Sequence, residues 1–302
     1  MNLFVYSQTS VDKCKVNLNN FDVSMVVDVG TDYSELQPYI DQNFDLIIGF
    51  GGGTAIDIAK YIAYKSNATC IAIPTMLSTD VYSTNKCCVK FNGVKSTEQA
   101  VKPISFFNRE ILELSPKENM YGLVDVFSIF TALLDWRLAD SFGVEPIDEI
   151  IYTRAEYLLE AAIYYSIIRP DWYRLYEIIQ HAGEITNDYG CGRPESGSEH
   201  IFSKLLEERF HIPHAVGVAI GIVCRSNVVK LEPTDYYKYE KILSKMRKIG
   251  IFDTAKNLGV TYDSIESVLK DIKPRVDRFT ILDTVKLDIE YIMKGVKNDI
   301  GW

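Results

Sequence analysis

Three side chains that lie far apart in the sequence have the types expected of a metal site. His200 begins one helical segment, and His214 begins the next one after a proline turn. Asp125 lies in the first turn of an otherwise apolar helical segment. A buried carboxylate is costly unless it is paired or ligates a metal. Two imidazoles and one carboxylate suit zinc or a similar divalent ion with an open coordination position.

Each of these residues also has an ordinary explanation. Asp125 can serve as a helix N-cap, and a histidine among apolar residues is more often a hydrogen-bonded core residue than a ligand. His211, three residues before His214, is a competing ligand. His181 follows an apolar helix face and is expected to be structural. The residues alone therefore leave the ligand set open.

A glycine run between a strand and a helix is the second pattern that points to chemistry. Gly51, Gly52 and Gly53 follow the apolar run 46–50, and a helical pattern over 55–64 begins directly afterwards. Glycine lets the backbone approach a ligand closely, and the start of a helix favours an anion. A diphosphate is the natural guest. The alternative is a tight turn without a ligand, because the run matches neither GxGxxG nor a P-loop.

Polar residues accompany this loop. Asp57 and Lys60 are three residues apart on the predicted helix, so they form either an exposed ion pair or part of an active cleft. Thr75, Ser78 and Asp80 follow the next predicted strand. Ligands bind at the carboxyl ends of strands in open α/β sheets. The alternative is a loop whose side chains satisfy their own backbone.

The elements that must position these residues change in character along the chain. Short apolar runs predict buried parallel strands at 3–6, 23–27, 46–50 and 70–73, with helices at 34–42 and 55–64 between them. Later segments repeat apolar residues every three or four positions and predict helices at 124–139, 148–168, 172–186, 199–210, 214–229, 236–249, 262–272 and 283–296. We therefore predict an α/β domain at 1–114 and an all-α domain at 115–302, with a ligand cleft between them.

Composition narrows the class of protein. The 302 residues include 32 Lys+Arg and 41 Asp+Glu, a net charge of −9, which argues against a general binder of nucleic acid or anionic membranes. Hydrophobic residues make up 47%, enough for a globular core. The chain shows no signal peptide and no membrane-spanning run. Six cysteines without a CxxC pair predict reduced thiols in the cytoplasm.

Five ordered motifs resemble the iron-containing alcohol dehydrogenase and dehydroquinate-synthase-like superfamily, and within it the glycerol-1-phosphate dehydrogenase branch. They are GGGTAIDIAK (51–60), PTMLSTD (74–80), YGLVDVFSIFTALLDWRLAD (121–140), RPESGSEHIFSKLLE (193–207) and PHAVGVAIG (213–221). The resemblance implies a dehydroquinate synthase-like fold, with a dinucleotide-binding α/β domain followed by a helical domain.

The resemblance also assigns roles to residues of this chain. The expected cofactor is NAD(H) or NADP(H), with its diphosphate at Gly51–Gly53. Further cofactor contacts are expected at Asp57, Thr75, Ser78 and Asp28, the last of which ends a strand and suits a ribose. The expected metal ligands are Asp125, His200 and His214, with zinc in many members of the superfamily and iron or nickel in some.

For the substrate, the resemblance implies a small keto or aldehyde compound, foremost dihydroxyacetone phosphate reduced to sn-glycerol 1-phosphate. Asp80 and Lys60 are the catalytic candidates, and Arg193 and Lys204 are candidates for holding the phosphate. The alternatives are a lyase or cyclase that uses NAD transiently, or a binding protein that retains the fold. Cyclase relatives usually have Glu as the first metal ligand, so Asp125 favours the dehydrogenase. A homodimer is the expected assembly.

Three departures from the superfamily pattern bear on the substrate. Only 50 residues precede Gly51, so the first βαβ unit is expected to be shortened. Ser203-Lys204 replaces a Ser-His pair, which places a cation after the first metal histidine. His214-Ala215 replaces a His-Gly pair, which adds a methyl group beside the last ligand. The last two changes suggest a substrate different from glycerol phosphate.

Overall fold

The computed structural model describes residues 1–301 and divides the chain into two compact units. Unit 1 comprises Met1–Asn119 and Asp171–Asn187, and unit 2 comprises Met120–Pro170 and residues from 188 onward. The sequence places the predicted domain boundary at 114–115. Residues 171–187, which fall on the helical side of that boundary, make their contacts within unit 1.

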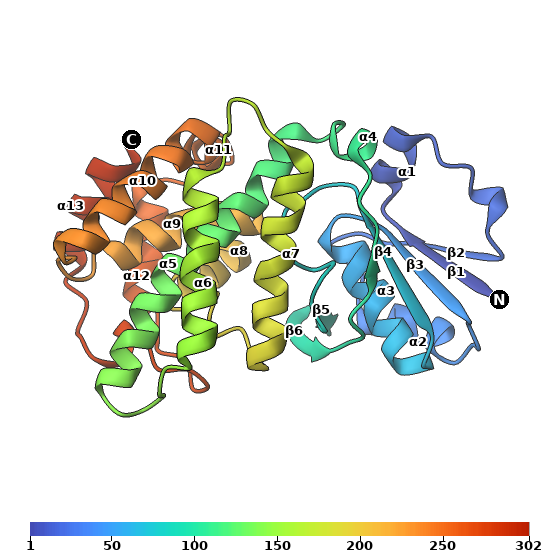
Figure 1. The fold of residues 1–302 in the computed structure, drawn as a ribbon, viewed down its shortest axis with the longest axis horizontal. Helices are drawn as coiled ribbons and strands as arrows, with labels where there is room; N and C mark the ends of the chain where they lie inside the picture. The colour runs from blue at the N-terminus through green and yellow to red at the C-terminus, as the bar shows by residue number, and fades with distance from the viewer. Residues whose placement is uncertain (302) are drawn as a thin grey trace. The chain divides into compact units, whose positions relative to one another are not determined.

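Unit 1 is built on a parallel sheet of five strands (Figure 1). In spatial order these are β2 (Val23–Val26), β1 (Asn2–Tyr6), β3 (Leu46–Gly51), β4 (Thr69–Pro74) and β7 (Ile104–Ser105). Its helices are α1 (Gln8–Cys14), α2 (Tyr33–Ile40), α3 (Gly53–Ser66), α4 (Arg109–Leu112) and α7 (Trp172–Tyr189), the last of which ends two residues beyond the unit. A two-stranded antiparallel hairpin, β5 (Lys86–Phe91) and β6 (Val94–Gln99), completes the unit.

The central strand β1 shows why the sequence forms this sheet. Leu3 and Val5 pack into a core with residues of α2 and α3, while Phe4 and Tyr6 pack on the opposite face with Val11 of α1. Successive side chains of a strand point to opposite faces, so a strand covered by helices on both sides must be apolar throughout. This confirms the predicted parallel α/β architecture.

Unit 2 is helical, as predicted. Its helices are α5 (Pro116–Ser141, whose first four residues belong to unit 1), α6 (Glu149–Tyr164), α8 (Glu199–Phe210), α9 (His214–Ser226), α10 (Pro233–Ile249), α11 (Ile251–Asn257), α12 (Tyr262–Asp271) and α13 (Ile289–Ile300). Helix α9 is buried over nearly its whole length, from Ala215 to Ser226. It forms the centre of unit 2.

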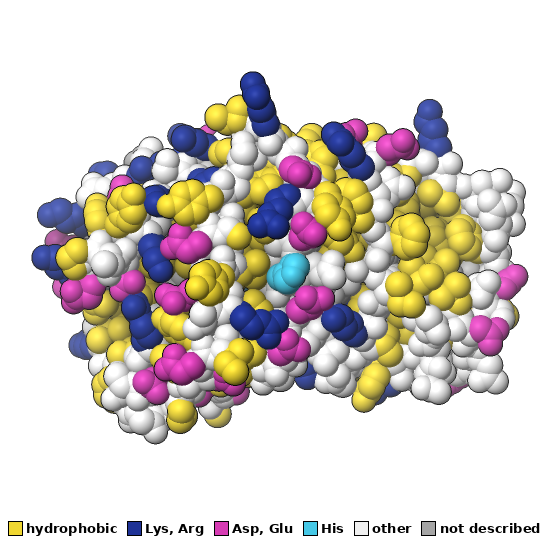
Figure 2. All heavy atoms as spheres, viewed as in Figure 1, with side chains coloured by type: hydrophobic (Ala, Val, Ile, Leu, Met, Phe, Trp, Pro, Cys, Tyr) yellow, Lys and Arg dark blue, Asp and Glu magenta, His cyan; other side chains and the backbone are white. Residues whose placement is uncertain are grey.

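The helices of unit 2 carry a mixed charge at their surface. On the face drawn in Figure 2, acidic and basic side chains alternate over these helices, with hydrophobic side chains between them. Among residues 1–301, no helix combines the length and apolar character needed to cross a membrane.

Candidate metal centre and cofactor groove

Three helices of unit 2 bring the predicted metal ligands together. Asp125 lies on α5, His200 in the first turn of α8, and His214 is the first residue of α9. Helices α8 and α9 approach closely because two glycines of α9 face α8. A Cβ on Gly217 would lie 2.5 Å from Ser203 Oγ, and one on Gly221 would lie 2.2 Å from Glu199 O.

The three side chains converge on one point. Asp125 Oδ1 lies 3.7 Å from His200 Nε2 and 3.4 Å from His214 Nε2. The two imidazole rings are 5.2 Å apart between centroids. One ligand atom from each residue lies within 4.8 Å of the other two, which is close enough for a single ion to contact all three.

Two glutamates that the sequence reasoning missed orient the imidazoles. Glu199 Oε1 lies 2.7 Å from His200 Nδ1, and Glu207 Oε1 lies 2.7 Å from His214 Nδ1. Ser203 Oγ donates to the same oxygen of Glu207 at 2.8 Å. When Nδ1 donates its proton to a carboxylate, Nε2 presents its lone pair, which is the usual arrangement of metal-binding histidines. The only feature of the sequence that could have indicated these roles is that Glu199 is adjacent to His200.

The electrostatics of this cluster favour a cation. Asp125 Oδ1 is buried and has no hydrogen-bond partner. Burial alone would raise the pKa of Asp125, but the two histidines outweigh it and hold that pKa below its ordinary value. Burial opposes the charging of His214, yet Asp125 and Glu207 raise its pKa, so the position next to Nε2 favours a positive charge, either a proton or a metal ion that replaces it. A buried oxygen without a donor, facing two Nε2 atoms and backed by two further carboxylates, fits a divalent ion.

The remaining histidines lie elsewhere. His211 ends α8 in a left-handed backbone conformation with φ 53° and is exposed. His181 is exposed, and its Nδ1 lies 2.7 Å from the carbonyl oxygen of Glu177 one turn earlier in α7. Neither joins the cluster of Asp125 and the two imidazoles within the described residues.

The two phosphate candidates are placed very differently. The Arg193 side chain is fully buried; its guanidinium donates to Phe279 O and Asp135 O, and its Nε lies 3.2 Å from Glu145. These contacts occupy the guanidinium, so we withdraw Arg193 as a phosphate ligand. Lys204 lies one turn after His200 on α8 and is 64% exposed, with only a distant contact of 4.0 Å to Glu208. Lys204 stays a candidate.

Unit 1 contains a groove at the carboxyl edge of its sheet, where the sequence predicts the cofactor. The groove has a volume of about 920 Å³ and is lined by Gly52, Gly53, Thr75 and Asp28, as predicted, together with residues that the sequence reasoning missed. Those include Ser7, Ser10, Lys13, Thr54, Met76 and Ser115. Ser7 follows the end of β1 just as Gly52 follows the end of β3, so the predicted strands could have placed Ser7 at the same edge of the sheet.

The glycine loop has the geometry of an anion site. Gly51 has φ +154°, and a Cβ there would lie 2.9 Å from Ala55 Cβ. Helix α3 begins at Gly53 without an acidic residue in its first turn. Its first N–H groups lack helical partners and lie at the groove, which suits a diphosphate. Thr75 Oγ1 contacts Ser10 Oγ at 2.9 Å, and this contact links the residue after β4 to helix α1.

The other predicted residues of unit 1 separate into two groups. Asp28 accepts a hydrogen bond from the Gly30 N–H at 2.6 Å, and its side chain lies in the groove. Gly51, Asp57 and Ser78, which were also predicted as cofactor contacts, are not among the lining residues. Asp80 lies in the segment after β4, and its carboxylate is close to α7. A Cβ placed on Gly183 of α7 would lie 3.0 Å from it.

Lys60 requires a correction. Its side chain is fully buried, and its ammonium donates to Val81 O at 2.7 Å, Thr84 Oγ1 at 3.0 Å and Lys86 O at 2.5 Å. Asp57 Oδ1 lies 3.9 Å away. The pair is therefore neither exposed nor part of a cleft. Lys60 ties α3 to the segment after β4, and we withdraw it as a catalytic residue.

The comparisons with known proteins agree with this fold. The family model for iron-containing alcohol dehydrogenase matches residues 8–113. Glycerol-1-phosphate dehydrogenase [NAD(P)+] from Methanococcus aeolicus is 31% identical over 255 residues, which cover 80% of this chain and 74% of that protein. The chain therefore belongs to the iron-containing alcohol dehydrogenase family and is an oxidoreductase.

The relatives also indicate a branch of that family. Glycerol-1-phosphate dehydrogenase [NAD(P)+] from Sulfolobus acidocaldarius is 28% identical over 296 residues, which cover 92% of this chain and 82% of that protein. The predicted resemblance to this branch is confirmed.

Solved structures share the fold at low sequence identity. A probable glycerol dehydrogenase from Sinorhizobium meliloti superposes with a TM-score of 0.70 at 16% identity, over 99% of this chain and 90% of that one. A sulfoacetaldehyde reductase from Bifidobacterium kashiwanohense, solved in complex with NAD+, gives 0.71 at 15% identity over the same shares. At these identities the likeness shows the fold alone.

Proposed function

We propose that this chain is a metal-dependent, NAD(P)-linked dehydrogenase that reduces dihydroxyacetone phosphate to sn-glycerol 1-phosphate or acts on a closely related polyol phosphate. The observation that carries the proposal is the convergence of Asp125, His200 and His214, with each imidazole oriented by its own glutamate. The relatives named glycerol-1-phosphate dehydrogenase support the substrate.

In unit 2, the proposed role of the three ligands is to hold one divalent ion. Glu199 and Glu207 keep the Nε2 atoms directed at that position. The chemistry that such an ion supplies is Lewis acidity toward a substrate oxygen as hydride arrives or leaves. Zinc is the proposed metal, because two histidines and one carboxylate leave an open position on it.

In unit 1, the proposed roles follow the groove. The first N–H groups of α3 and Lys13 would bind the cofactor diphosphate, and Asp28 would bind a ribose. The hydride comes from the nicotinamide. Asp80 is proposed to accept a hydrogen bond from a substrate hydroxyl, and Lys204 to pair with the substrate phosphate. The homodimer and the cytoplasmic location predicted from the sequence stay predictions.

The test is turnover with defined metal content. The purified protein, stripped by a chelator and reloaded with zinc, is mixed with NADH or NADPH and dihydroxyacetone phosphate, and the nicotinamide absorbance is followed. We expect stoichiometric oxidation of the cofactor, and formation of sn-glycerol 1-phosphate identified by chiral analysis. His200→Ala should abolish both, while His181→Ala, an exposed histidine of unit 1, should leave them unchanged. Conversion of a phosphorylated substrate to a product of the same oxidation level, with NAD required but no net change in NADH, would instead indicate a lyase or cyclase.

A further inference from the structure

A second groove lies in unit 2, formed by the end of α6, the loop that follows it and one face of α10. Its volume is about 520 Å³, within the roughly 300–1,000 Å³ typical of small-molecule sites. Ile163 and Tyr165 are buried, whereas Tyr164, Ile168 and Tyr237 are 63–85% exposed. None of the residues discussed for the metal or the cofactor lines this groove.

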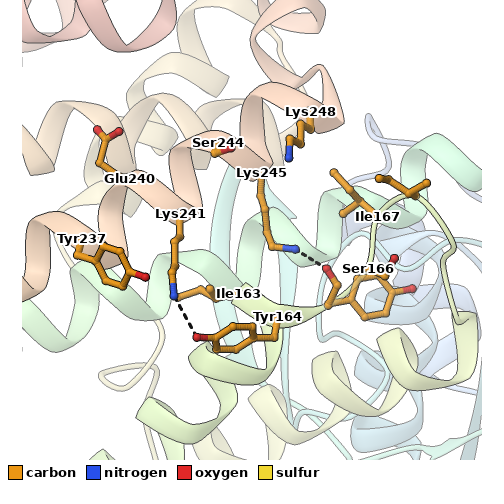
Figure 3. A pocket seen from close by; sticks show the side chains of 12 residues that line it. Ile163, Tyr164, Ser166, Ile167, Tyr237, Glu240, Lys241, Ser244, Lys245 and Lys248 are labelled. Atoms are coloured by element: carbon orange, nitrogen blue, oxygen red, sulfur yellow. Dashed lines mark hydrogen bonds between the residues drawn. The ribbon is translucent and has the colours of Figure 1, made fainter.

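Three lysines of α10 enter this groove together. Lys241, Lys245 and Lys248 follow one another at four and three residues, which places them on one face of the helix. Figure 3 shows Lys241 and Lys245 reaching from α10 toward the segment that holds Tyr164 and Ser166. Ser166 and Ser244 add two hydroxyls to the lining, and Glu240 is its only acidic residue.

Within residues 1–301, no ion pair with a carboxylate balances the positive charge of these lysines. Lys241 Nζ donates to Tyr164 Oη at 3.0 Å and lies 4.8 Å and 4.4 Å from the ring centroids of Tyr164 and Tyr237. Lys245 Nζ donates to the carbonyl oxygen of Tyr165. Among residues 1–301, neither these two nor Lys248 forms an ion pair with an acidic side chain.

The same helix provides the contrast. Lys238, one turn before Lys241, lies 3.5 Å from Glu156 and 3.6 Å from Glu160 of α6. The chain as a whole carries a net charge of −9, so acidic side chains are plentiful. Three lysines that share a groove without such partners therefore stand out from their surroundings.

Part of this arrangement has a structural explanation. Tyr165 follows the last residue of α6, and Lys245 binds its carbonyl, which stabilises the negative end of that helix. That contact explains the position of Lys245, but it does not explain why Lys241 and Lys248 share the groove with it. Burial lowers the pKa of Lys245, and the charge of Lys248 lowers it further. An anion between the two ammonium groups would relieve this repulsion.

We propose that this groove binds a small phosphorylated molecule, with its phosphate or diphosphate among Lys241, Lys245 and Lys248 and its organic part against Ile168 and Tyr164. Ammonium groups and serine hydroxyls are donors that match phosphate oxygens. A flat anionic surface fits less well, because the chain carries a net charge of −9 and the face drawn in Figure 2 mixes acidic with basic side chains. The site is separate from the proposed reaction and does not depend on it.

Lysine acetylation read by mass spectrometry tests this site residue by residue. The whole protein is treated with an acetylating reagent with and without pyrophosphate or AMP. At about ten times the dissociation constant, mass action leaves about a tenth of the sites free, so acetylation of Lys241 and Lys248 should slow about tenfold. Lys238 should be unaffected, and Lys13 reports separately on the cofactor groove.

Two variants sharpen the result. The double variant Lys241→Gln/Lys248→Gln leaves Lys245 on the helix end, and pyrophosphate should no longer protect Lys245 in it. The matched variant Lys238→Gln should keep that protection. Equal slowing at Lys238 and at the groove lysines, or protection of Lys245 that persists in the double variant, would overturn the proposal. Protection by phosphatidylglycerol vesicles but by neither soluble phosphate would overturn it in favour of a membrane contact.

Discussion

Glu207 determines which nitrogen of His214 faces Asp125. Its Oε1 accepts from Ser203 Oγ and lies against His214 Nδ1, so the carboxylate is fixed on one side by the serine and fixes the imidazole on the other. A ligand held this way does not have to be ordered when a metal binds, which strengthens binding. The same logic applies to Glu199, which is fully buried against His200.

Replacing Glu207 should therefore weaken metal binding without removing a ligand. We expect Glu207→Ala to lower zinc affinity about 10- to 100-fold, and Glu207→Gln to lower it less, because the amide oxygen still accepts from Nδ1. Competition with a chromophoric chelator measures the affinity. Glu208→Ala removes the neighbouring carboxylate, which is 55% exposed, and should change nothing. Equal affinities for all four proteins would show that Glu207 does not orient His214.

Asp28 should govern the choice of cofactor. Its carboxylate lies in the groove at the carboxyl end of β2, where it can accept from the ribose 2′-hydroxyl of NAD and repel the 2′-phosphate of NADP. We expect Asp28→Asn to bind NADPH about three- to tenfold more tightly, with NADH binding weakened. Fluorescence titration of each cofactor measures this. Asp41→Asn, an exposed acid outside the groove, is the control; a parallel change for both cofactors would contradict the assignment.

At the scale of elements, the proposed metal centre depends on how closely α8 and α9 pack. A Cβ placed on Gly221 would lie 2.2 Å from the backbone carbonyl oxygen of Glu199. A backbone atom cannot move aside as the end of a flexible side chain can. The first turn of α8 carries both Glu199 and His200. Spacing these helices apart would therefore disturb the site as well as the core.

Gly221→Ala should show both effects. We expect a loss of about 1–3 kcal/mol in the free energy of unfolding, typical of overpacking, together with weaker zinc binding. Urea unfolding and chelator competition measure the two quantities. Gly192→Ala is the matched control, because its Cβ would meet only ordinary contacts at 3.7 Å and beyond. A variant as stable as the parent protein would mean that α8 can shift to make room for the methyl group with little loss of free energy.

The same scale shows what the sequence predicts and what it does not. Helix α8 follows from the periodicity of its apolar residues, and strands β1 to β4 follow from their continuous apolar runs. The two-residue strand β7 (Ile104–Ser105) went unpredicted, because so short a segment has no pattern of its own. The β5–β6 hairpin went unpredicted although Asn92-Gly93, with φ 51° and 79°, is a typical two-residue turn. Helix α13 begins at Ile289 instead of 283, because the Asp288 side chain caps it by accepting from the Tyr291 N–H.

The residues of the candidate site also differ in how far the sequence alone could predict them. Asp125 stood out because a carboxylate is unusual in an apolar helix, but only the family resemblance selected it together with the two histidines as the expected ligand set. Glu207 was not predictable, because its relation to His214 exists only after α8 and α9 pack. Arg193 and Lys60 failed as candidates for the opposite reason. Both are long cations in motifs, and only the structure shows that backbone carbonyls deep in each unit occupy them.

At the scale of the whole molecule, Asp57, whose side chain is only 14% exposed, couples the stability of unit 1 to pH. Burial raises its pKa from 3.8 to about 7, while Lys60 opposes the rise. Between about pH 4 and pH 7 the folded protein thus binds more protons than the unfolded chain. The contribution of Asp57 is fully present below its unfolded pKa and falls as pH rises, by at most about 1.4 kcal/mol per pH unit.

Asp57→Asn should remove this dependence. We expect the difference in unfolding free energy between the parent protein and the variant to fall from pH 4 to pH 7 and to be constant above pH 7. Urea unfolding at a series of pH values measures it, with Asp41→Asn, an exposed acid, as control. A difference that does not vary over this range would show that Asp57 titrates near its ordinary pKa.

The division into two units makes a separate prediction about ligands. The proposed metal ligands lie on three helices of unit 2, whereas the proposed cofactor groove lies wholly in unit 1. A ligand stabilises what it binds by about 2.7 kcal/mol at 100 times its dissociation constant. If the units unfold in separate steps, zinc should raise the transition of unit 2 and NADH that of unit 1 in differential scanning calorimetry. His200→Ala should lose the first shift and keep the second. A zinc shift that survives in His200→Ala would mean that the metal binds elsewhere, and a single transition raised by both ligands would show that the units unfold together.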